Sequence, residues 1–198
     1  EFRRVLFRSC MPVGSGDTSR IWLLGFSNAV CVALLFVYST SFKRRLLIGN
    51  VLISLLTAWV ILVVAWCEYN HIMRTNNGLH AEKILQETFL FAGFAFIISL
   101  IREVVKDIED MDGDAKYGCK TMPIVWGVPA AKVFSGVWLV VLAGAITILL
   151  VYMLQKAWWL SAGYSFLLVI ALLYILRQLY KAQNTEQYHA VSSNIKWV

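Results

Sequence analysis

Six of the twelve acidic residues of this chain fall within one short segment, I-R-E-V-V-K-D-I-E-D-M-D-G-D, at residues 101–114. On a helix, residues three or four positions apart share a face. One such stripe consists of Glu103, Asp107, Asp110 and Asp114. Carboxylates stacked in this way repel one another, so the stripe predicts a cation that offsets their charge. Mg²⁺ prefers hard oxygen ligands and binds phosphates through a few carboxylates. We therefore expect a magnesium–phosphate site with Asp107, Asp110 and Asp114 as ligands; the alternative is a solvated acidic loop between membrane spans.

The same geometry separates the other acidic side chains from this stripe. Asp112 lies about 200° around a helix from Asp110, so it should point away and tolerate replacement by Asn. Glu109 lies about 100° off and should tolerate Gln. If the helix ends before Gly113, Asp114 would reach the site from a loop instead.

The composition is that of a membrane protein. Of the 198 residues, 59% are hydrophobic and 15% are charged, against about 45–50% and about 25% in soluble domains. The net charge of +6 could indicate nucleic acid, but the basic residues cluster at the ends of apolar runs, which membrane topology explains better. We expect no nucleic-acid partner. The four cysteines show neither C-x-x-C pairing nor metal-like spacing, so no disulfide framework is predicted.

Five apolar runs have the length of about 20 residues that a helix needs to cross a bilayer. They cover residues 21–38, 46–66, 84–101, 131–154 and 157–176. Because only helices and closed barrels satisfy their backbone groups in lipid, the predicted fold is an all-α polytopic membrane helix bundle. A polar loop with the turn signal N-N-G is expected at 67–83, and a loop with short helical pieces after Asp114.

The positive charges predict the orientation of these spans. The loops on one side carry eleven Lys and Arg residues and those on the other side carry four. The more positive side is expected in the cytoplasm, and it includes the acidic segment. Residues 1–9, E-F-R-R-V-L-F-R-S, fit neither a signal peptide nor a span, so we interpret them as a non-native cloning or assembly scar.

Other side chains could complete the site, each with a simpler alternative. Lys43 and Arg44 could hold a phosphate or could be a positive-inside anchor. Asn28 lies at mid-depth of the first span, where an interhelical hydrogen bond is the simpler role. Traced backwards along its helix, the acidic stripe continues through Ser99 and Phe96, which could leave room for a ligand or serve plain helix packing.

Two sequence features carry a family resemblance. D-I-E-D-M-D-G-D, followed by A-K-Y-G-C-K-T-M-P-I, resembles the second aspartate-rich motif, D-x-x-D-x-x-x-D, of the UbiA superfamily of intramembrane prenyltransferases. Upstream, Tyr-x₄-Lys-Arg and the I-G-N that begins the next span resemble another feature of that superfamily. The acidic motif and its T-M-P-I continuation are most similar to the geranylgeranylglycerol-phosphate geranylgeranyltransferase branch.

This resemblance implies a Mg²⁺-dependent membrane enzyme of the prokaryotic inner membrane. It would move an isoprenyl group from a prenyl diphosphate to a lipid or aromatic acceptor through an allylic cation. Mg²⁺ would be held by Asp107, Asp110 and Asp114, and the diphosphate would be bound by Lys43, Arg44 and Lys120. The cation would be stabilised by Tyr38, with Phe96 as a second candidate, and the prenyl cavity would be lined by Phe96, Ser99 and Asn28.

The chain also departs from the family pattern. The family has nine membrane helices and a first motif, N-D-x-x-D-x-x-x-D, but no N-D pair occurs here. We therefore expect residues 10–198 to be part of a UbiA-type domain that lacks both ends and is inactive alone.

Two other function classes remain open. A CDP-alcohol phosphotransferase also uses Mg²⁺ and aspartates, but its pattern, D-x-x-D-G-x-x-A-R, is not met by D-I-E-D-M-D-G-D-A-K. A cation transporter would carry its carboxylates within the span, whereas these lie at its cytoplasmic end.

Overall fold

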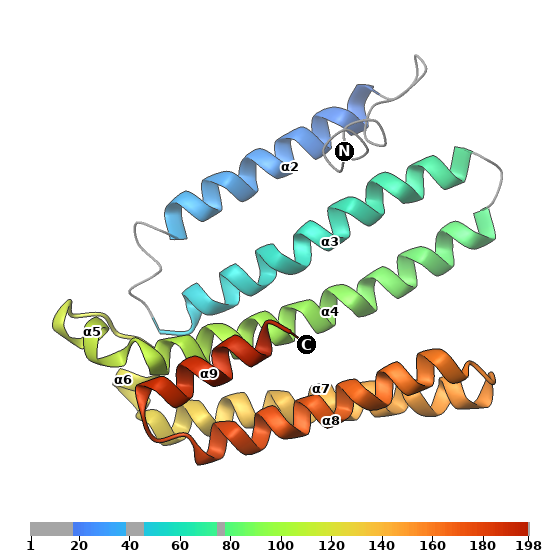
Figure 1. The fold of residues 1–198 in the computed structure, drawn as a ribbon. Helices are drawn as coiled ribbons and strands as arrows, with labels where there is room; N and C mark the ends of the chain where they lie inside the picture. Colours follow the sequence, from blue (N-terminus) through green and yellow to red (C-terminus); the bar gives the residue numbers. More distant parts are fainter. Residues whose placement is uncertain (1–17, 39–45, 75–77, 198) are drawn as a thin grey trace. The chain divides into compact units, whose positions relative to one another are not determined.

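The computed structural model describes residues 18–38, 46–74 and 78–197, all of them helical or in short connections (Figure 1). No strand occurs in these three segments, which confirms the all-α prediction. In chain order the helices are α2 (Thr18–Val37), α3 (Ile48–Arg74), α4 (Gly78–Glu109), α5 (Met111–Lys116), α6 (Met122–Trp126), α7 (Val128–Gln155), α8 (Trp159–Lys181) and α9 (Thr185–Ile195).

Four of these helices contain a stretch long and apolar enough to cross a membrane. The stretches are Ile48–Trp66, Glu82–Glu109, Val128–Gln155 and Trp159–Lys181. The first predicted span corresponds to α2, which is 20 residues long and has a shorter apolar stretch, Asn28–Val37, within its described part. The prediction of a polytopic helical membrane protein is thus confirmed.

The chain divides into two compact units, and each is described by itself. The first unit comprises residues 1–42 and 52–96, and holds α2, most of α3 and the beginning of α4. Here the prediction of a loop over residues 67–83 was wrong, because α3 continues to Arg74 and α4 already begins at Gly78. Polar residues past the end of an apolar run still form backbone hydrogen bonds within a helix, so their polarity alone does not indicate a loop.

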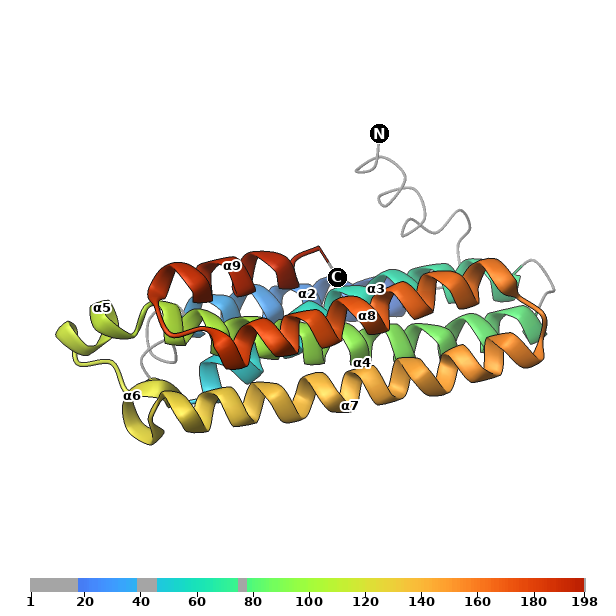
Figure 2. The same cartoon turned by 60° about the horizontal axis from the view of Figure 1, so that its bottom comes forward.

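The second unit comprises residues 43–51 and 97–198 and is centred on a helical hairpin. In it α7 packs along α8 in the antiparallel direction (Figure 2). The turn between them places Ala157 at a φ of 57°. Close packing is possible where α7 carries Gly136, since a Cβ there would come within 2.7 Å of the Tyr180 hydroxyl on α8.

A buried cluster joins the end of α4 to the other helices of this unit. Its members are Val104, Ile108, Met122, Ala131, Ala182 and Tyr188. They come from α4, α6, α7, the α8–α9 connection and α9, so the cluster anchors the last turns of α4. Leu47, just before α3, packs against the same cluster. The fold therefore supports the acidic segment with apolar packing from five parts of the chain.

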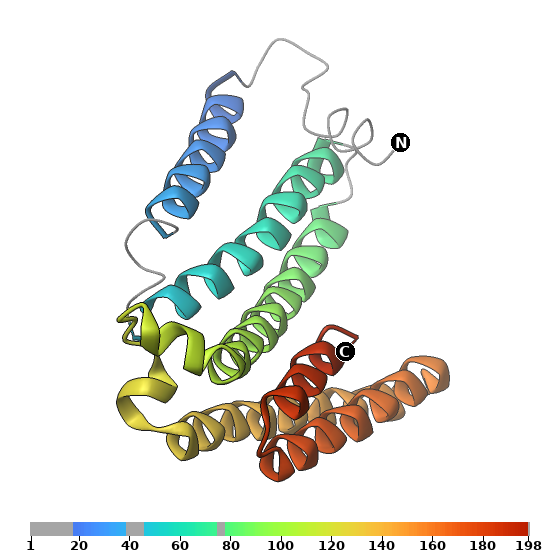
Figure 3. The same cartoon turned by 60° about the vertical axis from the view of Figure 1, so that its left-hand side comes forward.

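The polar segment that follows α8 forms a short amphipathic helix, α9. Its Tyr188, Val191, Ser192 and Ile195 are buried. At its start the side chain of Gln187 accepts a hydrogen bond from the backbone N–H of Gln183 at 2.7 Å, which satisfies a backbone donor at the helix entry. In Figure 3, α9 lies against the α7–α8 hairpin.

Candidate active site

The site begins with a hydrogen bond between the first turn of α3 and the end of α4. Asn50 Nδ2 donates to Asp107 Oδ2 at 2.7 Å. Asn50 is buried, with 7% of its surface exposed, and Asp107 is half-buried. A bond from an amide to a carboxylate is stronger than one between neutral groups. Asn50 therefore holds one oxygen of the Asp107 carboxylate in place.

The acidic stripe does not run along one helix. The last helical residue of α4 is Glu109, Asp110 forms a turn, and α5 carries Asp112 and Asp114. The backbone N–H groups of Gly113 and Asp114 both bond to the Asp110 carbonyl at 3.0 Å. Negative charge is unfavourable at a helix C-terminus and favourable at an N-terminus, which accounts for a break that leaves two acidic residues in the first turn of α5. Asp114 is therefore carried by α5, whereas Asp107 is carried by α4.

Despite this break, four carboxylates remain electrostatic neighbours. The negative charges of Asp114, Glu103 and Asp110 lie near enough to Asp107 to act unfavourably on its ionised form. Side chains of this kind are the hard oxygen ligands that suit Mg²⁺, so the donor set fits that ion. In the described segments no three His, Cys, Asp or Glu side chains converge closely enough to enclose a metal by themselves. Mg²⁺ usually binds through one or two carboxylates, waters and substrate phosphates, which is compatible with this open arrangement.

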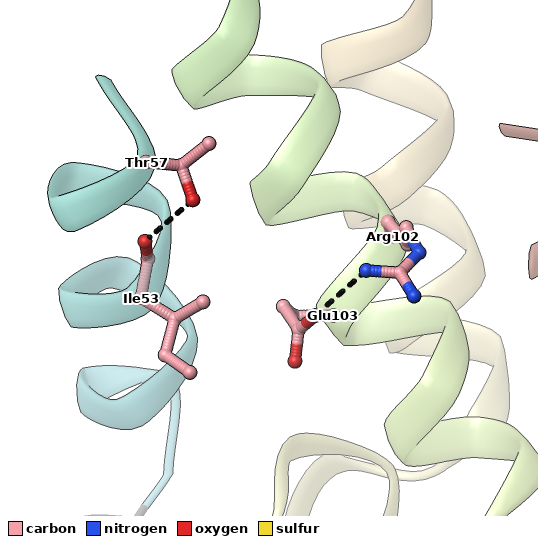
Figure 4. A network of polar contacts seen from close by, with 4 residues as sticks. All are labelled: Ile53, Thr57, Arg102 and Glu103. Atoms are coloured by element: carbon pink, nitrogen blue, oxygen red, sulfur yellow. Dashed lines mark hydrogen bonds and ion pairs between the residues drawn. The ribbon is translucent and has the colours of Figure 1, made fainter. Parts of the chain in front are cut away.

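One member of the stripe has a cationic neighbour on its own helix. Arg102 Nη1 lies 3.5 Å from Glu103 Oε1 (Figure 4). The Glu103 side chain is 16% exposed and that of Arg102 is 33% exposed. The long distance makes this a weak ion pair, and it offsets only part of the charge of the stripe. On α3, the Thr57 hydroxyl bonds to the Ile53 carbonyl one turn earlier at 3.0 Å.

The remaining predicted site residues are distributed over both units. Lys120 is exposed on the connection between α5 and α6, and Ser99 is half-buried on α4; both belong to the unit that holds Asp107. The other unit holds Asn28, exposed on α2, and Tyr38 and Phe96, both half-buried. Lys43 and Arg44 lie outside the described residues. A prenyl cavity and a diphosphate site built from these residues therefore stay predictions.

Two residues of the site were not assigned a role from the sequence. Asn50 was noted only as part of I-G-N, although a polar side chain in an apolar span is itself a signal of function. His189 was given no role, but its Nδ1 lies 2.6 Å from Glu109 Oε1. No sequence pattern reveals a contact between residues 80 positions apart.

Comparisons with known proteins identify the family of the chain. The model of the UbiA prenyltransferase family matches residues 13–196. The chain is similar to a "Digeranylgeranylglyceryl phosphate synthase" of Methanosphaera stadtmanae, at 30% identity over 87% of this chain and 57% of that protein. A protein of the same name from Methanopyrus kandleri is 32% identical over 71% of this chain and 47% of that protein. Another, from Haloquadratum walsbyi, is 34% identical over 70% and 52%.

The chain thus spans about half the length of the curated relatives it matches. No solved structure matches it. A family match over nearly the whole chain, on a helical membrane protein with the aspartate motif at the end of a span, is decisive. The chain belongs to the UbiA prenyltransferase family.

Proposed function

We propose that this protein transfers a geranylgeranyl group from its diphosphate to a lipid glyceryl phosphate that already carries one such chain. The reaction class follows from the family. The choice of acceptor rests on the relatives, whose name states that they make digeranylgeranylglyceryl phosphate. An apolar donor chain with a charged head group requires a polar site at the rim of an apolar bundle. Asp107 lies at such a place, at the end of a span-length helix.

The bond between Asn50 and Asp107 carries this proposal. Asp107, Asp110 and Asp114 would hold Mg²⁺, which supplies positive charge to the departing diphosphate. Asn50 orients the Asp107 carboxylate, so that this ligand is in place before the substrate arrives. Lys120, together with Lys43 and Arg44, would bind the diphosphate oxygens.

Other side chains of the protein would then stabilise the allylic cation and line the cavity for its hydrocarbon chain. The allylic C–O bond breaks and its electron pair leaves with the diphosphate. The ring of Tyr38, with that of Phe96 as a second, would stabilise the resulting cation. The acceptor hydroxyl oxygen attacks the cationic carbon and gives its proton to solvent or to the released diphosphate. Ser99 and Asn28 would line the cavity for the hydrocarbon chain.

Family membership counts against the two other classes that the sequence left open. A CDP-alcohol phosphotransferase would cleave a phosphoanhydride, and a cation transporter would perform no group transfer. We propose that the aspartate motif faces the cytoplasm, because the loops on its side carry the excess of Lys and Arg.

The test is a transfer assay with the whole protein in lipid nanodiscs. Labelled geranylgeranyl diphosphate would be supplied with geranylgeranylglyceryl phosphate, with an aromatic quinone precursor, or with a CDP-alcohol and glycerol phosphate. We expect a product only from the first pair, and only with Mg²⁺ and not with EDTA. Turnover of the aromatic acceptor alone would overturn the assignment of the acceptor, and CMP release would overturn the reaction class.

A further inference from the structure

Helix α9 is fixed to the hairpin by polar contacts near both of its ends. The Tyr188 hydroxyl donates to the Ala182 carbonyl at 3.0 Å, and Lys132 Nζ of α7 donates to the same carbonyl. Lys132 also lies 5.3 Å from the centre of the Tyr188 ring, within range of a cation–π contact. Asn194 Nδ2 donates to Gln178 Oε1 of α8 at 2.8 Å. With Tyr188 buried in the apolar cluster, α9 is a fixed element of this unit.

The residue next to Tyr188 connects α9 to the aspartate motif. His189 Nδ1 lies 2.6 Å from Glu109 Oε1. Because a carboxylate only accepts hydrogen bonds, this ring nitrogen carries the proton. Glu109 is the last residue of α4 and directly precedes Asp110, where the helix breaks. The contact therefore restrains the one backbone position from which the rest of the motif departs.

The segment beyond the break is the short helix α5. None of the residues of α5 is buried, and Asp110 makes no side-chain hydrogen bond as its N-cap. At the far end of α5, the Cys119 N–H bonds back to the Asp114 carbonyl at 3.0 Å, which is again a local contact. The direction in which the chain leaves Glu109 therefore contributes to the position of Asp114 relative to Asp107.

We propose that His189 is a positioning residue for the aspartate motif. Its bond to Glu109 fixes the end of α4, and with it the direction of α5 and the distance between Asp107 and Asp114. His189 itself touches no reacting group. This inference rests on the proposed function for its kinetic consequence, but its structural consequence holds without it.

The structural test is amide hydrogen exchange of the whole protein in nanodiscs, without substrate. His189→Ala should speed exchange at residues 110–116 by about three- to tenfold, the range expected for loss of a partly exposed charge-assisted hydrogen bond. His189→Gln keeps a side-chain N–H donor and should restore most of the protection. The control Glu186→Gln changes an exposed carboxylate on the same helix that has no assigned role. Glu109→Ala should match His189→Ala, and the double variant should add little, because both changes remove one interaction.

The kinetic test measures prenyl transfer against Mg²⁺ concentration for the same variants. His189→Ala should raise the Mg²⁺ concentration needed for half-maximal rate by a similar factor, while the KM for the prenyl acceptor stays within about twofold. Unchanged exchange at residues 110–116 in His189→Ala would overturn the proposal, as would equal loss of protection throughout α7 and α8. If no variant, wild type included, transfers a prenyl group, the proposed function fails, whereas the exchange result still decides the role of His189.

Discussion

Asn50 and Asp107 meet although the chain places them 57 residues apart. Burying either side chain without the other would cost free energy, since a half-buried carboxylate and a buried amide both lose hydrogen bonds to water. Together they satisfy one another and fix one oxygen of Asp107. Leu47 has a φ of 30°, which is rare for a residue with a side chain, and packs on the apolar cluster three positions before Asn50. The turn into α3 is therefore held where it can present Asn50 to the motif.

Replacing Asn50 by Ala should lower kcat/KM for prenyl transfer by about ten- to a hundredfold. A hydrogen bond to a charged group contributes about 1.5–3 kcal/mol, and its loss would leave Asp107 to rotate. The control is Thr147→Val, whose hydroxyl bonds to the Ala143 carbonyl of its own helix and should matter little. Full turnover by Asn50→Ala would show that the contact has no catalytic role.

Substitutions within the motif should divide the carboxylates into two groups. Asp107→Ala, Asp110→Ala and Asp114→Ala should each lower turnover by about 10²–10³-fold, the usual effect of losing a group that stabilises developing charge. Asp112 is exposed, and Asp112→Asn should change turnover by less than about twofold, because surface charges are screened. Raising Mg²⁺ should partly rescue the first group. If Asp107→Ala and Asp112→Asn affected turnover equally, the metal-site interpretation would be wrong and the segment would be an ordinary acidic loop.

At the scale of elements, α7 and α8 form a hairpin; α6 packs against α7, and α9 packs against α8. Two buried serines in this pair of helices differ in the hydrogen bonding of their hydroxyl groups. Ser165 of α8 donates to the Ser161 carbonyl at 2.9 Å and contacts Met153 Sδ at 3.5 Å. Ser135 of α7 is fully buried, and its hydroxyl has no hydrogen-bond partner within the described part of the chain.

These two serines should respond oppositely to removal of the hydroxyl. Ser135→Ala should leave thermal stability in detergent unchanged or raise it, by up to about 1 kcal/mol, because it removes an unpaired buried polar group. Ser165→Ala should lower stability by about 0.5–1.5 kcal/mol, because it removes a formed bond. The measurement is the unfolding midpoint of both variants in the same detergent. A loss of more than about 1 kcal/mol in Ser135→Ala would reveal a partner for its hydroxyl.

At the scale of the whole molecule, each membrane-spanning helix would connect loops that lie on opposite faces of the membrane. The α5–α6 connection precedes α7, and the turn at Lys156 follows it. Because the apolar stretch of α7 is 28 residues long, it is enough to place these two connections on opposite sides of a bilayer. The proposed orientation, in which the loops richer in Lys and Arg face the cytoplasm, predicts that the first of these connections lies on the cytoplasmic side.

Cysteine labelling would check this orientation. In a background with the four native cysteines replaced by Ser, we would introduce Tyr117→Cys, at a position 81% exposed, or Lys156→Cys at the α7–α8 turn. An impermeant maleimide should label Tyr117→Cys only in inside-out vesicles and Lys156→Cys only in intact cells. The reverse pattern would put the aspartate motif on the outer face, and labelling of both from one side would contradict α7 as a span.

The lengths of the apolar runs and the spacing of the aspartates were sufficient to predict helices, a membrane and a polar site. This information is local. A run of about 20 apolar residues has few conformations open to it in lipid other than a helix, and a D-x-x-D-x-x-x-D pattern indicates which carboxylates are neighbours. The sequence did not predict where helices stop. It suggested one stripe through Asp114, whereas the helix breaks at Asp110, where acidic residues meet the negative end of α4.

Tertiary structure alone decided which distant side chains complete the site. Asn50 reaches Asp107 across 57 residues, and His189 reaches Glu109 across 80. Both contacts depend on the apolar cluster, in which Leu47 packs before the first of these residues and Tyr188 beside the second. Such packing depends on side-chain volumes from five parts of the chain at once, and no local pattern encodes it. The spacing therefore identified neighbouring carboxylates, while the contacts that support them were decided by the way the helices pack.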